Sequence, residues 1–189
     1  IRMKKILLLL MSVLLILSGC STMTTSEKMQ KRSELDTMAK TAIAGLVEQD
    51  PKIQTELDES LGYAVANMKL TKVPIVGVGG GEGVLVNKNT KQHVYFTVSR
   101  FDLGGGWGAR SFKALMIFQH RGAMDRLEDN IWEFQAGAEA SAGTASAEGS
   151  SANLDTGFTM HVLSDGGASA TVTARVIRIV VNKELTEIP

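Results

Sequence analysis

The sequence has one cysteine, three prolines and only 5% aromatic residues, and these shortages exclude several classes of protein. A single thiol, Cys20, can form neither an internal disulfide nor a zinc site with several cysteine ligands. The 20 basic residues balance the 20 acidic ones, so the chain lacks the strongly basic composition that is typical of nucleic-acid binding. The 189 residues, 44% of them apolar, are sufficient for one folded domain or two very small ones.

An apolar run near the N-terminus is typical of a secretion signal. Met3, Lys4 and Lys5 precede residues 6–17, which are apolar except for Ser12. As a helix this run would rise about 18 Å, which is shorter than the ~30 Å hydrocarbon core of a bilayer. We therefore interpret residues 1–19 as a signal peptide and not as a membrane-spanning helix. After this segment the chain carries 17 basic and 20 acidic residues, a net charge of −3.

The residues before the single cysteine resemble the lipobox of bacterial lipoproteins. Leu17, Ser18 and Gly19 precede Cys20, and Ser21 follows it. The resemblance implies that Cys20 carries palmitate-type acyl chains, and Ser21 in place of Asp implies sorting to the outer membrane. Several acyl chains, at ~0.8 kcal/mol per buried methylene, give a firm anchor. The alternative is an ordinary signal peptide that contains a cysteine by chance. We expect a lipid-anchored protein of the bacterial cell envelope that faces the periplasm.

The segment after Cys20 predicts a flexible tether followed by two helices. Residues 20–32 are polar and lack apolar periodicity, which favours a tether leading to one domain over residues 33–189. Ser33 begins a capping-box pattern, and Pro51, preceded by a potential N-cap aspartate, begins a second, short helix. The first helix has one apolar stripe, formed by Leu35, Met38, Ala39, Ala42, Ile43, Leu46 and Val47. Its small residues and few cations favour packing on a core over lying on lipid.

After Gly62 the apolar period changes to two, which predicts strands. Two glycine runs, 79–83 and 104–108, lack the lysine and the following helix of a phosphate loop. We therefore predict that Gly79, Gly80, Gly81 and Gly83 serve close backbone approach or sharp bending and do not bind an anion. The Ser-Asp-Gly-Gly sequence at 164–167 predicts a hairpin turn. The predicted fold class is α+β: two N-terminal helices followed by a mainly antiparallel, glycine-rich sheet of about seven strands.

The sequence contains no recognisable catalytic set. His93, His120 and His161 are far apart and have no neighbouring His or Cys, so each is interpreted as a strand-face residue and not as a metal ligand. The chain also lacks the G-x-S-x-G pattern of a nucleophile elbow. We expect no enzyme activity, no cofactor and no metal.

Two lysine pairs are candidate contacts for anionic lipid. With a net charge of −3 after the signal peptide, attraction to such lipid must come from a local cluster of cations. If the strands on the two sides of the first glycine run pair as a hairpin, Lys69 and Lys72 lie at the same end as Lys88 and Lys91. The four lysines would then form one cationic rim. The alternative is that they are solvated loop charges.

Three motifs, in order, resemble the SYLF lipid-binding domain family. They are LGYAV at 61–65, GVGGGEGVLVNK at 77–88 and GGGWGA at 104–109, followed by a predicted strand at 112–118 and a predicted helix at 122–130. The resemblance spans roughly residues 35–181. It implies an α+β domain without enzyme activity that binds phosphoinositides or other anionic lipids. The alternative is a structural or assembly lipoprotein whose domain binds an envelope protein.

Overall fold

The computed structural model describes residues 23–129, 131–136, 139–142, 145–148 and 157–187. The predicted signal peptide and Cys20 lie outside the described residues. Helices α2 (Thr25–Gln49) and α3 (Lys52–Glu59) come first and antiparallel strands follow, so the predicted α+β class is confirmed. The strands are β1 (Gly62–Lys72), β2 (Val76–Asn87), β3 (His93–Phe118), β4 (Ile131–Ala136), β5 (Glu139–Ala142), β6 (Ala145–Glu148) and β7 (Phe158–Val181). Helix α4 (Arg121–Glu128) precedes β4, and α5 (Lys183–Thr186) follows β7.

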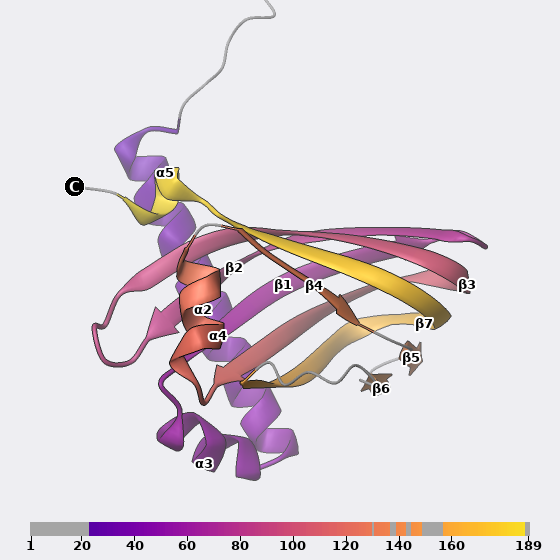
Figure 1. Cartoon of the computed structure of the whole chain (residues 1–189), viewed down its shortest axis with the longest axis horizontal. Coiled ribbons are helices and arrows are strands. Elements are labelled where there is room, and N and C mark those ends of the chain that lie inside the picture. Colours follow the sequence, from indigo (N-terminus) through magenta and orange to yellow (C-terminus); the bar gives the residue numbers. More distant parts are fainter. Residues whose placement is uncertain (1–22, 130, 137–138, 143–144, 149–156, 188–189) are drawn as a thin grey trace, which may run out of the picture.

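The sheet is folded over, so that it has an inner and an outer face (Figure 1). It has seven strands: six follow the path β1-β2-β3-β7-β5-β6, and β4 pairs with β7 beside this path. Strands β3 and β7 are paired from Phe96 and Val181 to Phe118 and Phe158. The first half of β3 also pairs with β2 and its second half with β1, while β1 and β2 pair with each other. One strand can have all these neighbours only if it bends.

The bend of β3 lies in the second glycine run. Gly104 and Gly108 have φ angles of 129° and 140°, which residues with a side chain rarely adopt. The run is therefore part of one continuous, bent strand. Beyond this run, between Ser111 and Phe112, the register of β7 shifts by one residue, so that Asp165 is extra in the ladder. The predicted hairpin turn at 164–167 is wrong, because these turn-forming residues make a bulge in a continuous strand.

The inner face of the sheet holds one apolar core. Side chains that alternate along β1, β2 and β3 meet there, and α4 closes the end near Phe118 with its buried Met124 and Leu127. Phe118, Trp132 and Phe158 contact one another at this end, with ring centroids 5.3 Å apart for Trp132 and Phe158. Among Ala66, Phe112 and Ile177 the core leaves a cavity of about 40 Å³, so side chains fill this part of the interior.

The outer face is covered by α2 and α3. Leu35, Ala39, Ala42 and Leu46 of the predicted apolar stripe are buried there, against strand residues such as Leu115. The prediction that this stripe packs on a core is confirmed. The helix approaches β7 closely at Gly45, where an added Cβ would lie 3.1 Å from Cδ2 of Leu163.

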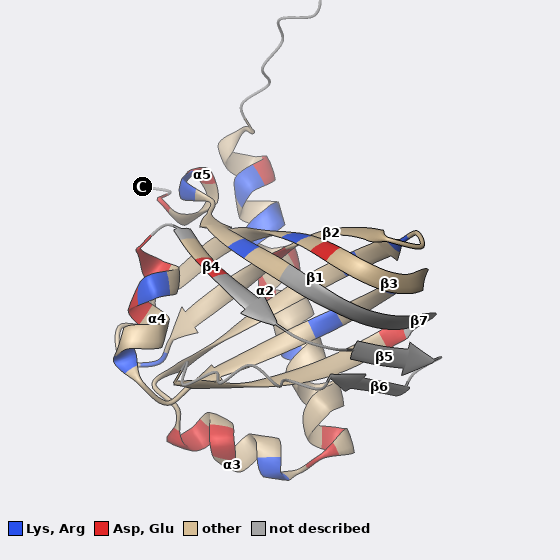
Figure 2. Ribbon diagram, turned by 45° about the vertical axis from the view of Figure 1, so that its right-hand side comes forward, with Lys and Arg blue, Asp and Glu red and all other residues tan. Residues whose placement is uncertain are grey.

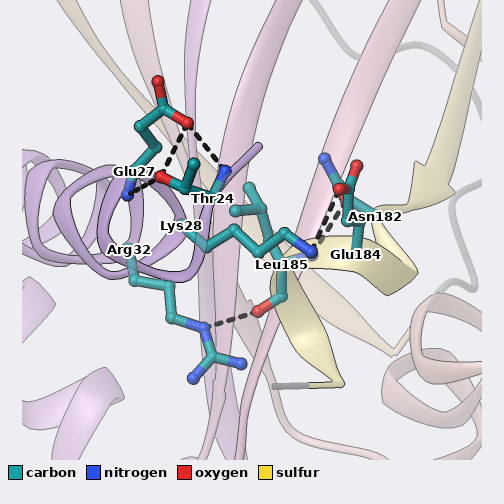
Figure 3. A network of polar contacts seen from close by, with 7 residues as sticks. All are labelled: Thr24, Glu27, Lys28, Arg32, Asn182, Glu184 and Leu185. Carbon is teal, nitrogen blue, oxygen red and sulfur yellow. Dashed lines mark hydrogen bonds and ion pairs between the residues drawn. The ribbon is translucent and has the colours of Figure 1, made fainter. Parts of the chain in front are cut away.

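Helix α2 begins at Thr25 and not near Ser33, so the predicted flexible tether is wrong for residues 25–32. Its capping box is formed by Thr24 and Glu27: the Glu27 amide donates to Oγ1 of Thr24, and the Thr24 amide donates to Oε2 of Glu27 at 2.7 Å (Figure 3). Helix α5 holds these first turns through polar contacts. Lys28 pairs with Glu184 at 3.0 Å, and the Arg32 guanidinium donates to the carbonyls of Leu185 and Thr186. Lys28 and Arg32 thus contact residues of α5 that are about 150 positions further along the sequence.

Candidate functional site

Large apolar side chains are exposed together at the end of the sheet that carries the β1–β2 turn and the bend of β3, on the right of Figure 1. We call this surface the apolar tip. Ile75 and Trp107 are its most exposed members, at 70% and 69%. Proteins that stay monomeric in water seldom gather large apolar side chains in this way. The apolar tip consists of Val73, Ile75, Val78, Phe101, Leu103, Trp107 and Val176.

Hydrogen bonds and strand register join these side chains into one surface. The amide of Gly104 donates to the carbonyl of Ile75 at 2.9 Å, and the amide of Gly106 donates to that of Pro74 at 3.3 Å. The β1–β2 turn is therefore fixed against the bend of β3. Register places Val78 of β2 beside Phe101 of β3, and Phe101 beside Val176 of β7. The tip is continuous across three strands.

In an ordinary soluble sheet the polar side chains of a strand face water and the apolar ones are buried. At the tip this alternation is reversed. Phe101 and Leu103 are exposed, whereas Arg100 and Asp102 between and beside them are buried. Nε and Nη2 of Arg100 donate to the two carboxylate oxygens of Asp102 at 2.8 and 2.9 Å. Burial of an ion pair costs desolvation energy, and this two-bond geometry offsets part of that cost. The reversal favours an outer surface that meets an apolar environment.

The surroundings of the tip carry little negative charge. Within residues 69–81 and 97–109 the one acidic residue is Asp102, which is 0% exposed. Lys69 is exposed on the outer face of β1, two positions along the ladder from the Thr71–Val78 pair. In Figure 2 the ends of β2 and β3 on this side are largely tan, whereas α2, α3 and α4 carry many of the blue and red segments. Along these two described segments a cation therefore borders the tip, and no exposed carboxylate does.

The predicted cationic rim does not form. Lys69 and Lys72 lie near the β1–β2 turn, whereas Lys88 and Lys91 follow β2 at the opposite end of the hairpin. At about 3.3 Å per residue along the strand, Lys88 lies roughly 26 Å from Lys69 and roughly 36 Å from Lys72. The prediction was wrong because the turn lies at residues 73–75, and the first glycine run lies inside one continuous strand.

The individual lysines also differ in environment. Lys72 faces inward and is 2% exposed, and its aliphatic carbons occupy space left by Gly77, where an added Cβ would lie 3.4 Å from them. Lys88 donates to the carbonyls of Leu57 and Asp58 at 2.6 and 2.8 Å, at the end of α3. Lys91 is an exposed turn residue with a φ of 60°. Of the four, only Lys69 lies on the exposed surface beside the apolar tip.

The first glycine run brings strands into close contact, as predicted. An added Cβ on Gly81 would lie 2.1 Å from the carbonyl oxygen of Asn67, and one on Gly83 would lie 2.4 Å from that of Val65. Neither glycine has a positive φ, so the requirement is for space and not for an unusual conformation. Because the run is paired with strands on both sides, its amides belong to the sheet and do not form an anion-binding loop.

Two of the three histidines connect the sheet to the helices. His93 contacts Asp36 of α2 at 3.0 Å, and His161 contacts Glu56 of α3 at 2.9 Å. The Tyr95 hydroxyl also donates to Asp36, and burial together with this negative charge raises the pKa of Tyr95 to about 12. Among the described residues, no group of three or more His, Cys, Asp and Glu side chains is arranged to hold a metal. In the same part of the chain, no helix is long and apolar enough to cross a bilayer.

Fold and surface together define a small α+β domain with a folded-over antiparallel sheet and an exposed apolar end. No protein-family model matches the sequence. The chain is similar to Beta cell expansion factor A of Aeromonas veronii, with 25% identity over 158 residues, which are 84% of this chain. The match covers 60% of that relative, so this chain spans about three fifths of its length. The similarity to the SYLF family stays a prediction.

The apolar tip is not among the features predicted from the sequence, although the sequence contains two signals of it. Val73 and Ile75 flank a proline in a turn, where polar residues are usual, and Trp107 stands alone in a glycine run. The exposure of Phe101 and Leu103 had no such signal. Because side chains alternate along a strand, Phe101 and Leu103 must lie on the face opposite to Arg100 and Asp102. Alternation does not say which of the two faces meets water.

Proposed function

We propose that this domain binds membrane lipid by placing the apolar tip in the interfacial region of a bilayer, and that the chain is a non-enzymatic, outer-membrane lipoprotein that faces the periplasm. The observation that carries the proposal is the convergence of seven exposed apolar side chains on one end of the sheet. Their transfer from water is favourable by roughly 1 kcal/mol each, since full burial of such a side chain contributes about 1.5–3 kcal/mol and these are already partly covered. Seven such contributions sum to about 7 kcal/mol before the costs of association.

The chemistry of the tip favours a lipid surface over a protein partner. The amides of Gly104 and Gly106 and the carbonyls of Pro74 and Ile75 are already paired, so the turn and the bend enter an apolar phase with these groups satisfied. An exposed tryptophan is typical of the membrane interface, where its ring lies among apolar groups and its N–H meets water. Lys69 beside the tip suits anionic headgroups, each nearby cation contributing about 1 kcal/mol.

With the expected acyl anchor at Cys20, the tip would need only a modest affinity for lipid to stay in contact with the membrane. A protein held at the membrane by its lipid presents the tip at high effective concentration. We therefore expect the two membrane contacts to act independently: the anchor determines location, and the tip determines how the domain contacts lipid. Binding by the tip then has to persist in a chain that lacks the anchor.

The test is co-sedimentation of residues 21–189 with phosphatidylcholine vesicles, with and without phosphatidylglycerol. We expect the parent to sediment with both, and more strongly with the anionic vesicles. Ile75→Ser/Trp107→Ser removes the two most exposed members of the tip and abolishes most binding. Met29→Ser is the matched control, because Met29 is 62% exposed but lies on α2. Thermal unfolding of each variant checks that the fold persists.

Two results contradict the proposal: sedimentation of the double variant equal to that of the parent, or equal losses in the double variant and in Met29→Ser. If the parent does not bind either kind of vesicle and instead cross-links through the tip to one envelope protein, the tip is a protein-docking surface.

Trp107 supplies a second readout. It is exposed, whereas Trp132 is 6% exposed in the core. Vesicles are expected to shift the tryptophan emission to shorter wavelength, and brominated lipid is expected to quench it. Trp107→Phe retains binding but loses both signals. An unchanged spectrum in the presence of bound vesicles would show that another surface makes the contact.

A further inference from the structure

A groove on the helical side of the domain has a composition different from that of the apolar tip. Helices α2 and α3 and the ends of β1 and β2 line an open hollow of about 520 Å³, a size typical of small-molecule sites. Its walls are largely apolar. Ile43 and Val47 come from α2, Leu57 from α3, and Tyr63 and Val86 from the sheet.

A second hollow, of about 610 Å³, continues the groove along α2. The two hollows adjoin, because Lys40 and Lys91 line both of them. The second hollow is lined mainly by hydrogen-bonding side chains, among them Ser33, Thr37 and Gln92. The groove therefore has an apolar half and a polar half, with two lysines at the boundary.

The charge at this boundary is positive. Within the described parts of the chain, the side chains of Lys40 and Lys91 form no hydrogen bond or ion pair. The carboxylates in the groove are already engaged. Asp36 accepts from Tyr95, and Asp58 accepts from Gln54 at 2.9 Å. The two ammonium groups are thus available to an anion.

We propose that this groove binds one molecule of a single-chain amphiphile with an anionic head, such as a fatty acid. The chain lies against Ile43, Val47 and Tyr63, and the head lies between Lys40 and Lys91. From Lys40 to Val47 the helix rises about 10 Å, which suits a chain of medium length. This site binds a dissolved monomer and is separate from the tip, which contacts a bilayer.

The experiment is calorimetric titration of residues 21–189, which include every residue that the structure describes. Dodecanoate and dodecyltrimethylammonium, each below its micelle concentration, have the same chain and opposite charges. We expect dodecanoate to saturate one site per chain and the cationic probe to bind at least tenfold more weakly. Equal affinities, or no saturable binding of dodecanoate, would overturn the proposal.

Variants locate the site. Ala44→Trp fills the apolar half from an exposed position of α2, and Lys40→Glu/Lys91→Glu reverses the charge at the boundary. Each is expected to weaken dodecanoate binding at least tenfold with unchanged thermal unfolding. Lys52→Glu is the matched control, because Lys52 is exposed on α3 and lines neither hollow. An equal loss in Lys52→Glu would show a response to net charge alone and overturn the assignment.

The tip variant separates this proposal from the one above. Ile75→Ser/Trp107→Ser is expected to bind dodecanoate as the parent does. Loss of dodecanoate binding in that variant, with retention in Ala44→Trp, would place the probe at the tip and overturn the groove assignment. If the parent binds dodecanoate but does not bind vesicles, only the proposal that the tip enters a bilayer is contradicted, and the groove proposal stands.

Discussion

Replacement of Gly81 by alanine tests the reason for the first glycine run. The new Cβ would lie 2.1 Å from the carbonyl oxygen of Asn67 and 2.7 Å from Sδ of Met68. The sulfur belongs to a flexible side chain and can move, but the oxygen belongs to the backbone of β1, which pairs with β2 along its whole length. Relief of the overlap therefore requires the two strands to separate locally.

Two opposing effects determine the magnitude. Overpacking typically costs 1–3 kcal/mol, and overlap with backbone places this site at the upper end, about 3 kcal/mol. Loss of conformational freedom in the unfolded chain stabilises a Gly→Ala variant by about 0.4–1 kcal/mol. The net expectation is a loss of about 2 kcal/mol in the free energy of unfolding. For a domain of this size, the melting temperature falls by roughly 4–8 °C.

The assay is urea unfolding followed by circular dichroism, with the midpoint and the slope compared between variants. Gly105→Ala is the matched control, because an added Cβ at Gly105 meets nothing within 4 Å. Equal stability of the two variants would refute the close-approach argument. A stable Gly81→Ala protein that had lost binding to a nucleotide would instead support a phosphate loop.

Three further predictions address other parts of the structure. Asp102→Ala removes one partner of a buried ion pair and is expected to lower the free energy of unfolding by about 3 kcal/mol in urea, whereas Arg100→Met/Asp102→Leu stays much closer to the parent. Stability is expected to be complete below pH 10 and to fall as the pH rises to about 12, because the pKa of Tyr95 is raised from 10.0 to about 12 in the folded state. Tyr95→Phe should reduce this alkaline loss, and a pH profile unchanged from that of the parent would exclude the assignment. Cys20→Ser is expected to abolish labelling by radioactive palmitate and to release the protein from the outer membrane; continued labelling would contradict lipidation at this residue.

Local patterns were sufficient for the helices and for the fold class. The stripe of Leu35, Ala39, Ala42 and Leu46 is buried as predicted, because a period of 3.6 places these residues on one side of a helix whatever the helix contacts. Ile53 and Leu57 of α3 are buried in the same way. Period-two segments likewise became strands. The close contacts at Gly81 follow from the same kind of local information, since the absence of a side chain permits close approach wherever the strand pairs.

Predictions that depended on a turn were less successful. The Ser-Asp-Gly-Gly sequence at 164–167 has the composition of a hairpin turn, yet β7 continues through it beside the bent β3. The four lysines failed for a related reason, because their predicted cluster required a hairpin around the glycine run. Turn composition permits a reversal, but the pairing of neighbouring strands decides whether the chain reverses, bends or bulges.

The sequence by itself determined that residues 35–47 and 53–57 are helical, that most of the chain after Gly62 is extended, which helix face is apolar, and where backbones can approach. Only the tertiary structure decided that Phe101 faces water while Asp102 is buried, because a strand has two faces and alternation does not say which one the rest of the protein covers. The first turns of α2 could not be predicted from local sequence either. Arg32 in these turns donates to carbonyls of α5, which are about 150 residues further along the chain. The apolar tip and the groove both arise in this way: each joins residues that are distant in sequence, and only the bending of β3 and the position of α2 on the sheet bring them together.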